Sequence, residues 1–139
     1  MIKLEEIVAR YYAAFNARDL ESYARLFTPD AEMVAPGVSA RGLEAIRAFD
    51  LGWQGPFPEA RVENFRMLSA GNTLVAGNWF HGGPHRGVLH APQGDVPPTG
   101  KVLSAPYCSM FTFQGERISR QQVMYEPAWV PIQLGLVGA

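Results

Sequence analysis

The stretch that decides the fold runs from Tyr107 to Leu136 and reads YCSMFTFQGERISRQQVMYEPAWVPIQLGL. Strand-like runs lie on both sides of Gln114-Gly115-Glu116, which is the pattern of a β-hairpin closed by a glycine turn. Glu126 stands at the end of the second run. The only other acids after Gly94 are Asp95, in a loop, and the acid of the turn itself. Glu126 is therefore the one acid of this region left to serve a pocket.

Upstream of the hairpin, helical patterns come first and strand patterns follow. Apolar residues at Leu4, Ile7, Val8, Tyr11 and Phe15 form one stripe of a helix. We expect a first helix over about 2–17 and a second from Asp19 to Phe27, ended by Thr28-Pro29-Asp30. A strand over 31–35 follows, and then a third helix opened by Gly42, with Leu43, Ile46, Phe49 and Trp53 facing inward. The rest of the chain is expected to form strands over 60–68 and 73–81, a long loop over 82–100, and strands over 101–113 and 117–125.

Three helices followed by antiparallel strands predict an α+β domain. A curved sheet wrapped over helices would leave a cavity on its concave side. With 139 residues, the chain is expected to form a single domain over 1–139.

Composition excludes several partner classes. The formal net charge of −1 argues against nucleic acid or an anionic membrane as a main partner. No apolar run approaches the roughly 20 residues that span a bilayer. The single cysteine, Cys108, allows no internal disulfide and suits a reducing compartment. We expect a soluble, cytoplasmic protein.

Four segments carry a family likeness. They are YYAAFNARDLESYARLFTPDAEM (11–33), RGLEAI (41–46), GGPHRG (82–87) with PPTGK (97–101), and Tyr125-Glu126 with QLGL (133–136). In these segments the chain resembles the SnoaL-like polyketide cyclases, within the cone-shaped α+β superfamily of nuclear transport factor two and ketosteroid isomerase. The resemblance implies one SnoaL-like domain with a cone-shaped α+β barrel. Three features depart from the family pattern: glutamate replaces the usual aspartate at 126, Pro84 replaces a threonine, and Pro127 and Pro131 interrupt a helical tail.

The resemblance also implies a chemistry. In such cyclases an acid on the last strands takes a proton from the carbon next to a carbonyl and returns it later in ring closure. Glu126 matches that position. Its task needs a raised pKa, which an apolar pocket supplies by penalising the charged form. The alternative is a carboxylate at the rim, paired with Arg120 or Arg66.

Three further polar residues are candidates for stabilising the enolate oxygen. His85 lies in the loop that matches the family, and its alternative is a histidine bonded to backbone. His81 ends a strand and is the second candidate histidine. Gln122 shares a strand face with Glu126, so it points into the cavity if Glu126 does and no bulge intervenes.

An aromatic-rich interior suits an apolar, ring-bearing or polycyclic small molecule. The residues expected to bind the substrate are Tyr12, Phe15, Trp53, Trp79, Met124 and Trp129. No metal or cofactor is indicated, because the histidines are not spaced as ligands and no phosphate-binding loop is present. A homodimer is expected, paired through the outer sheet face and the apolar end 132–137.

Two function classes follow. The first is an enzyme of the cyclase or isomerase type, using acid–base catalysis without a cofactor. The alternative is a non-catalytic small-molecule-binding or dimeric interaction module on the same scaffold. Epoxide hydrolysis ranks last, because no pair of inward aspartates is apparent. A ketosteroid-type isomerase would need a tyrosine and a second acid; Tyr12 could serve, but no second acid is evident.

Overall fold

The computed structural model describes residues 2–91 and 94–136. Along the chain, its elements are α1 (Leu4–Ala17), α2 (Leu20–Ala24), β1 (Phe27–Ala35), β2 (Val38–Arg41), α3 (Leu43–Gln54), β3 (Arg61–Ala70), β4 (Thr73–Pro84), β5 (Leu89–Ala91), β6 (Gly94–Val96), β7 (Val102–Gln114), β8 (Arg117–Met124) and α4 (Trp129–Gln133).

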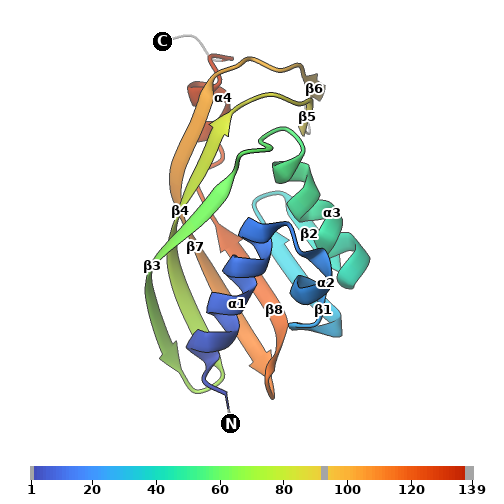
Figure 1. Cartoon of the computed structure of the whole chain (residues 1–139), viewed down its shortest axis with the longest axis vertical. Helices are drawn as coiled ribbons and strands as arrows, with labels where there is room; N and C mark the ends of the chain where they lie inside the picture. The colour runs from blue at the N-terminus through green and yellow to red at the C-terminus, as the bar shows by residue number, and fades with distance from the viewer. Residues whose placement is uncertain (1, 92–93, 137–139) are drawn as a thin grey trace.

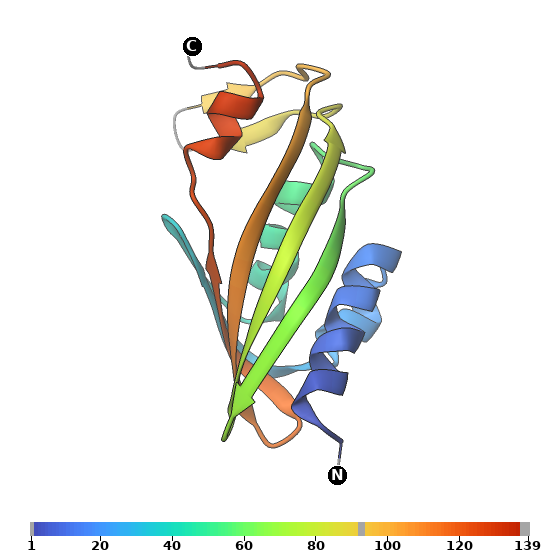
Figure 2. The same ribbon diagram turned by 90° about the vertical axis from the view of Figure 1, so that its left-hand side faces the viewer.

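One curved sheet of six strands dominates the molecule. Its order is β2-β1-β8-β7-β4-β3, while β5 and β6 form a separate hairpin. Neighbouring strands of the large sheet are antiparallel except β1 and β8, which run parallel. The sheet curls around α1 and α3, and α4 lies at the same end as the small hairpin (Figures 1 and 2). The predicted α+β fold with a mostly antiparallel curved sheet is confirmed.

The three N-terminal helices form where the apolar spacing predicts them. In α1 the buried positions include Ile7, Val8, Tyr11 and Phe15, one stripe of the helix facing the sheet. α2 begins at Asp19, whose side chain accepts a hydrogen bond from the Ser22 backbone N–H at 3.1 Å. The stripe packs α1 against the sheet, and α2 packs against α1 and α3.

The strand pattern departs from expectation around proline. β1 begins at Phe27, so Pro29 lies inside a strand instead of ending a helix. The pairing of β1 with β8 shifts between Phe27 and Glu32, which leaves Pro29 in an irregular stretch where its missing N–H is tolerated. β2, next to β1, was not predicted.

Two more elements were missed near the C-terminal half of the chain. β5 and β6 form within the predicted loop 82–100, of which residues 92–93 lie outside the described part. α4 forms despite two prolines. Pro127 precedes the helix, and Pro131 falls in its first turn, where a backbone N–H has no partner within the helix.

The core is packed between the concave face and α1. Alternate residues of the central strands point inward, among them Leu74 and Phe111, both fully buried. Tyr11, Tyr12 and Phe15 belong to this core and also form one wall of a cavity. Within 2–91 and 94–136, no helix has the length and apolarity needed to cross a bilayer.

Candidate active site

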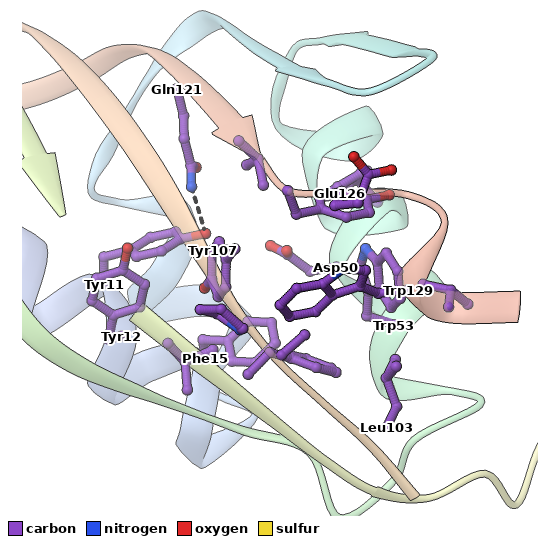
Figure 3. A pocket seen from close by; sticks show the side chains of 18 residues that line it. Tyr11, Tyr12, Phe15, Asp50, Trp53, Leu103, Tyr107, Gln121, Glu126 and Trp129 are labelled. Atoms are coloured by element: carbon purple, nitrogen blue, oxygen red, sulfur yellow. Dashed lines mark hydrogen bonds between the residues drawn. The ribbon is translucent and has the colours of Figure 1, made fainter. Parts of the chain in front are cut away.

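A cavity of about 80 Å³ lies between the concave face of the sheet and helices α1, α3 and α4. Figure 3 shows the side chains that surround it. They are Tyr11, Tyr12, Phe15, Phe49, Asp50, Trp53, Val62, Phe80, Leu103, Ala105, Pro106, Tyr107, Gln121, Val123, Tyr125, Glu126, Trp129 and Val130.

Asp50 is the buried acid of this cavity. It lies on α3 with 4% of its surface exposed, and its Oδ2 has no hydrogen-bond partner among residues 2–91 and 94–136. Its carboxylate points between the aromatic side chains, toward Tyr107 (Figure 3). Burial raises the pKa of Asp50 from 3.8 to about 7, and the phenol of Tyr23 opposes that rise only in part. A carboxyl group with this pKa can both accept and donate a proton near neutral pH.

A polar wall of tyrosine hydroxyls and amides lies deeper in the cavity. Gln121 Nε2 donates to Tyr11 Oη at 3.1 Å, and Asn78 Nδ2 donates to Tyr12 Oη at 2.8 Å. Burial raises the pKa of Tyr11, Tyr12 and Tyr107, so these phenols keep their protons at neutral pH. Each phenol that accepts a bond from an amide can turn its own O–H toward a ligand oxygen.

The sequence analysis missed Asp50, although its position carries a signal. Ile46 and Trp53 were expected to face inward, and Asp50 lies four residues after the first and three before the second. At that spacing on a helix it shares their face. Asp50 is therefore a second acid at the cavity, where the sequence had suggested none. The signal for it in the sequence is an acidic residue within an otherwise apolar helix stripe.

Glu126 lies at the rim and not in the interior. The residue is exposed, and Figure 3 shows its carboxylate pointing away from the cavity. Its Oε1 accepts a hydrogen bond from the Ala128 backbone N–H at 3.1 Å. Arg120, considered as its partner, instead contacts Glu32 at 3.1 Å. The expectation of a buried Glu126 is corrected by this geometry, because the chain leaves β8 just before it.

Gln122 also lies outside the cavity lining. The pairing of β7 with β8 shifts between Thr112 and Phe113, so Ile118 and Gln121, three residues apart, both face inward. Gln122 and Met124 then face the outer side of the sheet, and neither lines the cavity. Glu126 itself follows the end of β8, and its carboxylate points away from the cavity (Figure 3), so the condition on which Gln122 was expected inside is not met.

His81 and Trp79 lie on the outer face as well. In β4 the buried positions are Leu74, Ala76, Asn78 and Gly82, which places the odd-numbered neighbours outside. His81 Nε2 lies 2.8 Å from Glu63 Oε1, and Trp79 Nε1 donates to Ser104 Oγ at 2.6 Å. Neither residue can reach a ligand in the cavity from that face.

His85 is fully buried but outside the cavity lining. Its Nδ1 accepts a hydrogen bond from the Thr99 backbone N–H at 3.1 Å, and its ring packs on Phe57 at 5.2 Å between centroids. The His85 backbone also bonds Gly100 and Lys101, each at 2.9 Å. The alternative raised for this residue, a loop histidine bonded to backbone, matches the structure.

Four of the predicted substrate-binding residues do line the cavity. Tyr12 and Phe15 come from α1, Trp53 from α3 and Trp129 from α4. α4 is held over this end of the cavity by Gln133, whose amide bonds both backbone groups of Ser104, at 2.7 and 2.9 Å. The helix therefore positions Trp129 at the mouth.

The sequence matches the family model described as the SnoaL-like domain over residues 8–121. This chain belongs to the SnoaL-like domain family. No protein of curated function has a matching sequence. In residues 2–91 and 94–136 of this SnoaL-like protein, no group of three or more His, Cys, Asp or Glu side chains is placed to hold a metal ion.

Solved structures show the same fold. A proposed SnoaL-like polyketide cyclase from Jannaschia sp. CCS1 has a TM-score of 0.81 at 20% identity, with 97% of this chain and 93% of that chain covered. AclR, a proposed hydroxylase from Streptomyces galilaeus, has a TM-score of 0.80 at 16% identity, with 97% of each chain covered.

A protein of ketosteroid isomerase-like fold from Catenulispora acidiphila, solved in complex with trimethylamine, has a TM-score of 0.76 at 20% identity, with 94% of this chain and 92% of that chain covered. At these identities the likeness establishes the fold and leaves the reaction open, since one scaffold carries many functions.

Proposed function

We propose that this SnoaL-like protein is an enzyme that catalyses cofactor-free acid–base chemistry on a small carbonyl compound, with Asp50 as the base. The observation that supports it best is a buried carboxyl group that forms no ion pair within the described part of the chain and is directed into an aromatic cavity. Such a group carries a pKa of about 7, close to the optimum for proton transfer at neutral pH. Asp50 replaces Glu126 in the role that the sequence analysis gave to the C-terminal acid.

The proposed reaction begins when ionised Asp50 removes a proton from the carbon next to a carbonyl. The electron pair of that C–H bond moves onto the carbonyl oxygen, which gives an enolate and a protonated Asp50. Phenol donors such as Tyr11, Tyr12 and Tyr107 stabilise the oxygen. Return of the proton to another carbon completes an isomerisation. In an aldol-type ring closure the enolate carbon instead attacks a second carbonyl, and protonated Asp50 gives its proton to the alkoxide that forms.

The cavity favours a small apolar substrate. Its volume of about 80 Å³ is below the roughly 300–1,000 Å³ of pockets that enclose drug-sized ligands. We therefore propose a compound with one small ring in place of the polycyclic substrate expected from the sequence. The aromatic side chains would contact the ring while the tyrosine hydroxyls bind its oxygen.

Deuterium exchange tests the assignment. In deuterated buffer, the protein is expected to accelerate exchange of the protons next to the carbonyl of cyclohexanone, followed by proton NMR. Asp50→Asn should lower the rate by about 10²–10⁴-fold, the contribution of a placed general base. Asp30→Asn is the matched control, because Asp30 is exposed and outside the cavity lining.

Glu126→Gln separates the two candidate acids. If Asp50 is the base, this variant keeps most of the exchange rate. Loss of exchange in Glu126→Gln with retention in Asp50→Asn would return the role to Glu126 and overturn the proposal. Circular dichroism of each variant confirms that the fold is intact.

The second candidate function is a non-catalytic small-molecule-binding or dimeric interaction module. The observation in its favour is an apolar outer sheet face, which includes exposed Phe65 (62%) and Leu68 (66%). We propose that the SnoaL-like protein forms a homodimer through this face, whether or not it is catalytic. Ile132 and Leu136 of the apolar end are exposed as well, while Val137 lies outside the described residues. A cytoplasmic location stays a prediction that rests on the lone cysteine.

A further inference from the structure

The charges of the cavity all have one sign. Among its eighteen lining residues are two carboxylates, Asp50 inside and Glu126 at the rim, and no lysine, arginine or histidine. A phosphate or carboxylate ligand would meet no positive group there. The electrostatic field of the site therefore selects against anions and favours cations.

Within residues 2–91 and 94–136, Asp50 forms no ion pair with a lysine, arginine or histidine, and no cation lowers its pKa. The titratable groups that face it are the phenols of Tyr11 from α1, Tyr23 from α2 and Tyr107 from β7, all neutral at pH 7. Glu126 at the rim adds negative charge. A buried carboxylate usually has a paired cation, because desolvation without a partner is costly. Asp50 is accessible to a positively charged group only from its cavity side, where a ligand can supply that positive charge.

The walls suit a cation with an apolar shell. Nine lining residues are aromatic, from Tyr11 in α1 to Trp129 in α4. Trp53 meets Phe80 and Tyr125 edge-on, with centroid distances of 5.7 and 5.8 Å, so the rings form a corner. Aromatic faces arranged in this way attract alkylammonium ions through their quadrupoles, most strongly where water is excluded.

We propose that the cavity takes a small organic ammonium ion, held between the Asp50 carboxylate and the surrounding aromatic rings. This deepens the proposed function and rests on it for the choice of pocket, since it names the charge class of the ligand. An ammonium group beside Asp50 keeps that carboxyl ionised, which is the form able to remove a proton. A tertiary or quaternary nitrogen fits best, because its alkyl groups contact the rings and need no hydrogen-bond acceptor.

A pair of ligands with the same shape and different charge tests the inference. Choline and 3,3-dimethylbutan-1-ol differ by one atom, N⁺ in place of carbon. Titration calorimetry, together with fluorescence of the cavity residues Trp53 and Trp129, would give both affinities. At pH 8 we expect choline to bind at least about tenfold more tightly than the alcohol, an advantage set by ionised Asp50.

Two controls isolate Asp50. Asp50→Asn should abolish the preference for choline while leaving the alcohol's affinity within about twofold, and Asp30→Asn should leave both unchanged. Choline itself does not titrate. A gain in its affinity by about tenfold from pH 6 to pH 8 would therefore report ionisation of an acid with a pKa near 7.

Equal affinities for the two ligands, no binding of choline, or a preference that survives in Asp50→Asn would each overturn the ammonium proposal. These outcomes are separable from failure of the proposed function. Exchange of cyclohexanone protons uses a neutral ketone, so it can succeed with a cavity that does not prefer ammonium ions. Conversely, selective choline binding without any exchange would uphold this inference and contradict the catalytic one.

Discussion

At the residue scale, the energetics of the molecule centre on the carboxyl group of Asp50. Its pKa is about 7 in the folded protein against 3.8 for an unburied aspartate. Folding is thus easier when Asp50 is protonated than when it is ionised. The folded state holds more protons than the unfolded chain between these two values, so this group's contribution to stability falls as pH rises through that window.

We expect the free energies of unfolding of the native protein and of Asp50→Asn to depend differently on pH. Relative to the native protein, Asp50→Asn should gain stability as pH rises from 4 to 8, by up to about 4 kcal/mol. Little difference should remain at pH 4, where the folded native protein holds Asp50 protonated and this residue is only partly ionised in the unfolded chain. Urea unfolding of both proteins across this range measures it. A constant difference between native protein and variant at all pH values would mean that Asp50 titrates normally.

Single side chains were the hardest features to predict. The inward stripe on α3 was identified from Ile46 and Trp53, yet the acid between them was passed over because aspartate is not an apolar residue. His85 was correctly placed in a loop, but its burial depends on Phe57, a contact between segments far apart in sequence. The spacing on α3 did indicate the side of Asp50, whereas the burial of His85 cannot be read from local spacing.

At the element scale, α4 depends on one side chain. Gln133 forms two hydrogen bonds with the Ser104 backbone on β7, and Leu134 beside it is buried with 1% exposed. The intervening chain from Tyr125 therefore has a fixed end, and Trp129 is kept at the mouth of the cavity. The Gln-Leu-Gly segment thus attaches the C-terminal tail to β7.

Removing the hydrogen bonds between Gln133 and Ser104 should destabilise the protein. Gln133→Ala leaves the half-buried Ser104 groups without their partner, and we expect a loss of about 1–3 kcal/mol. Ile132→Ala in the same helix is the control, because Ile132 is 58% exposed and should change stability by less than about 0.5 kcal/mol. Thermal unfolding compares them. Equal midpoints for the two variants would show that the amide bonds carry no stability.

Elements with strong periodicity were predicted well, and those governed by proline or by pairing were not. The helices around Ile7 and Ile46 followed from spacing alone. α4 and the first residues of β1 were obscured by Pro131 and Pro29, because proline disfavours regular structure only at certain positions within an element. Gln122 was expected in the cavity only if Glu126 pointed into it, and the Glu126 carboxylate points away from the cavity.

At the scale of the whole molecule, the order of elements and the family segments predicted the cone, and the structure confirms it. The set of residues that line the cavity was not predictable, because these residues come from α1, α3, α4 and four strands of the large sheet that meet only in the folded chain. The outer face of the sheet is the other large-scale feature. It exposes Phe65, Leu68, Trp79, Val102 and Met124.

Self-association through that face has a direct test. Leu68→Lys places a charge in the proposed interface and should shift a homodimer toward monomer in sedimentation equilibrium. Leu51→Lys is the matched control, since Leu51 is 49% exposed but lies on α3, away from the outer face. A native protein that is monomeric at all concentrations, or equal dissociation of both variants, would rule out this interface.

The central claim, that Asp50 is a buried carboxyl group titrating near neutral pH, is tested most directly by carbon-13 NMR. The chain has four aspartates, at positions 19, 30, 50 and 95, so selective labelling of the side-chain carboxyl carbons gives a simple spectrum. The three others are exposed, and Asp50→Asn assigns the remaining signal. We predict that this signal titrates at about pH 7. A midpoint near pH 4 would contradict the account.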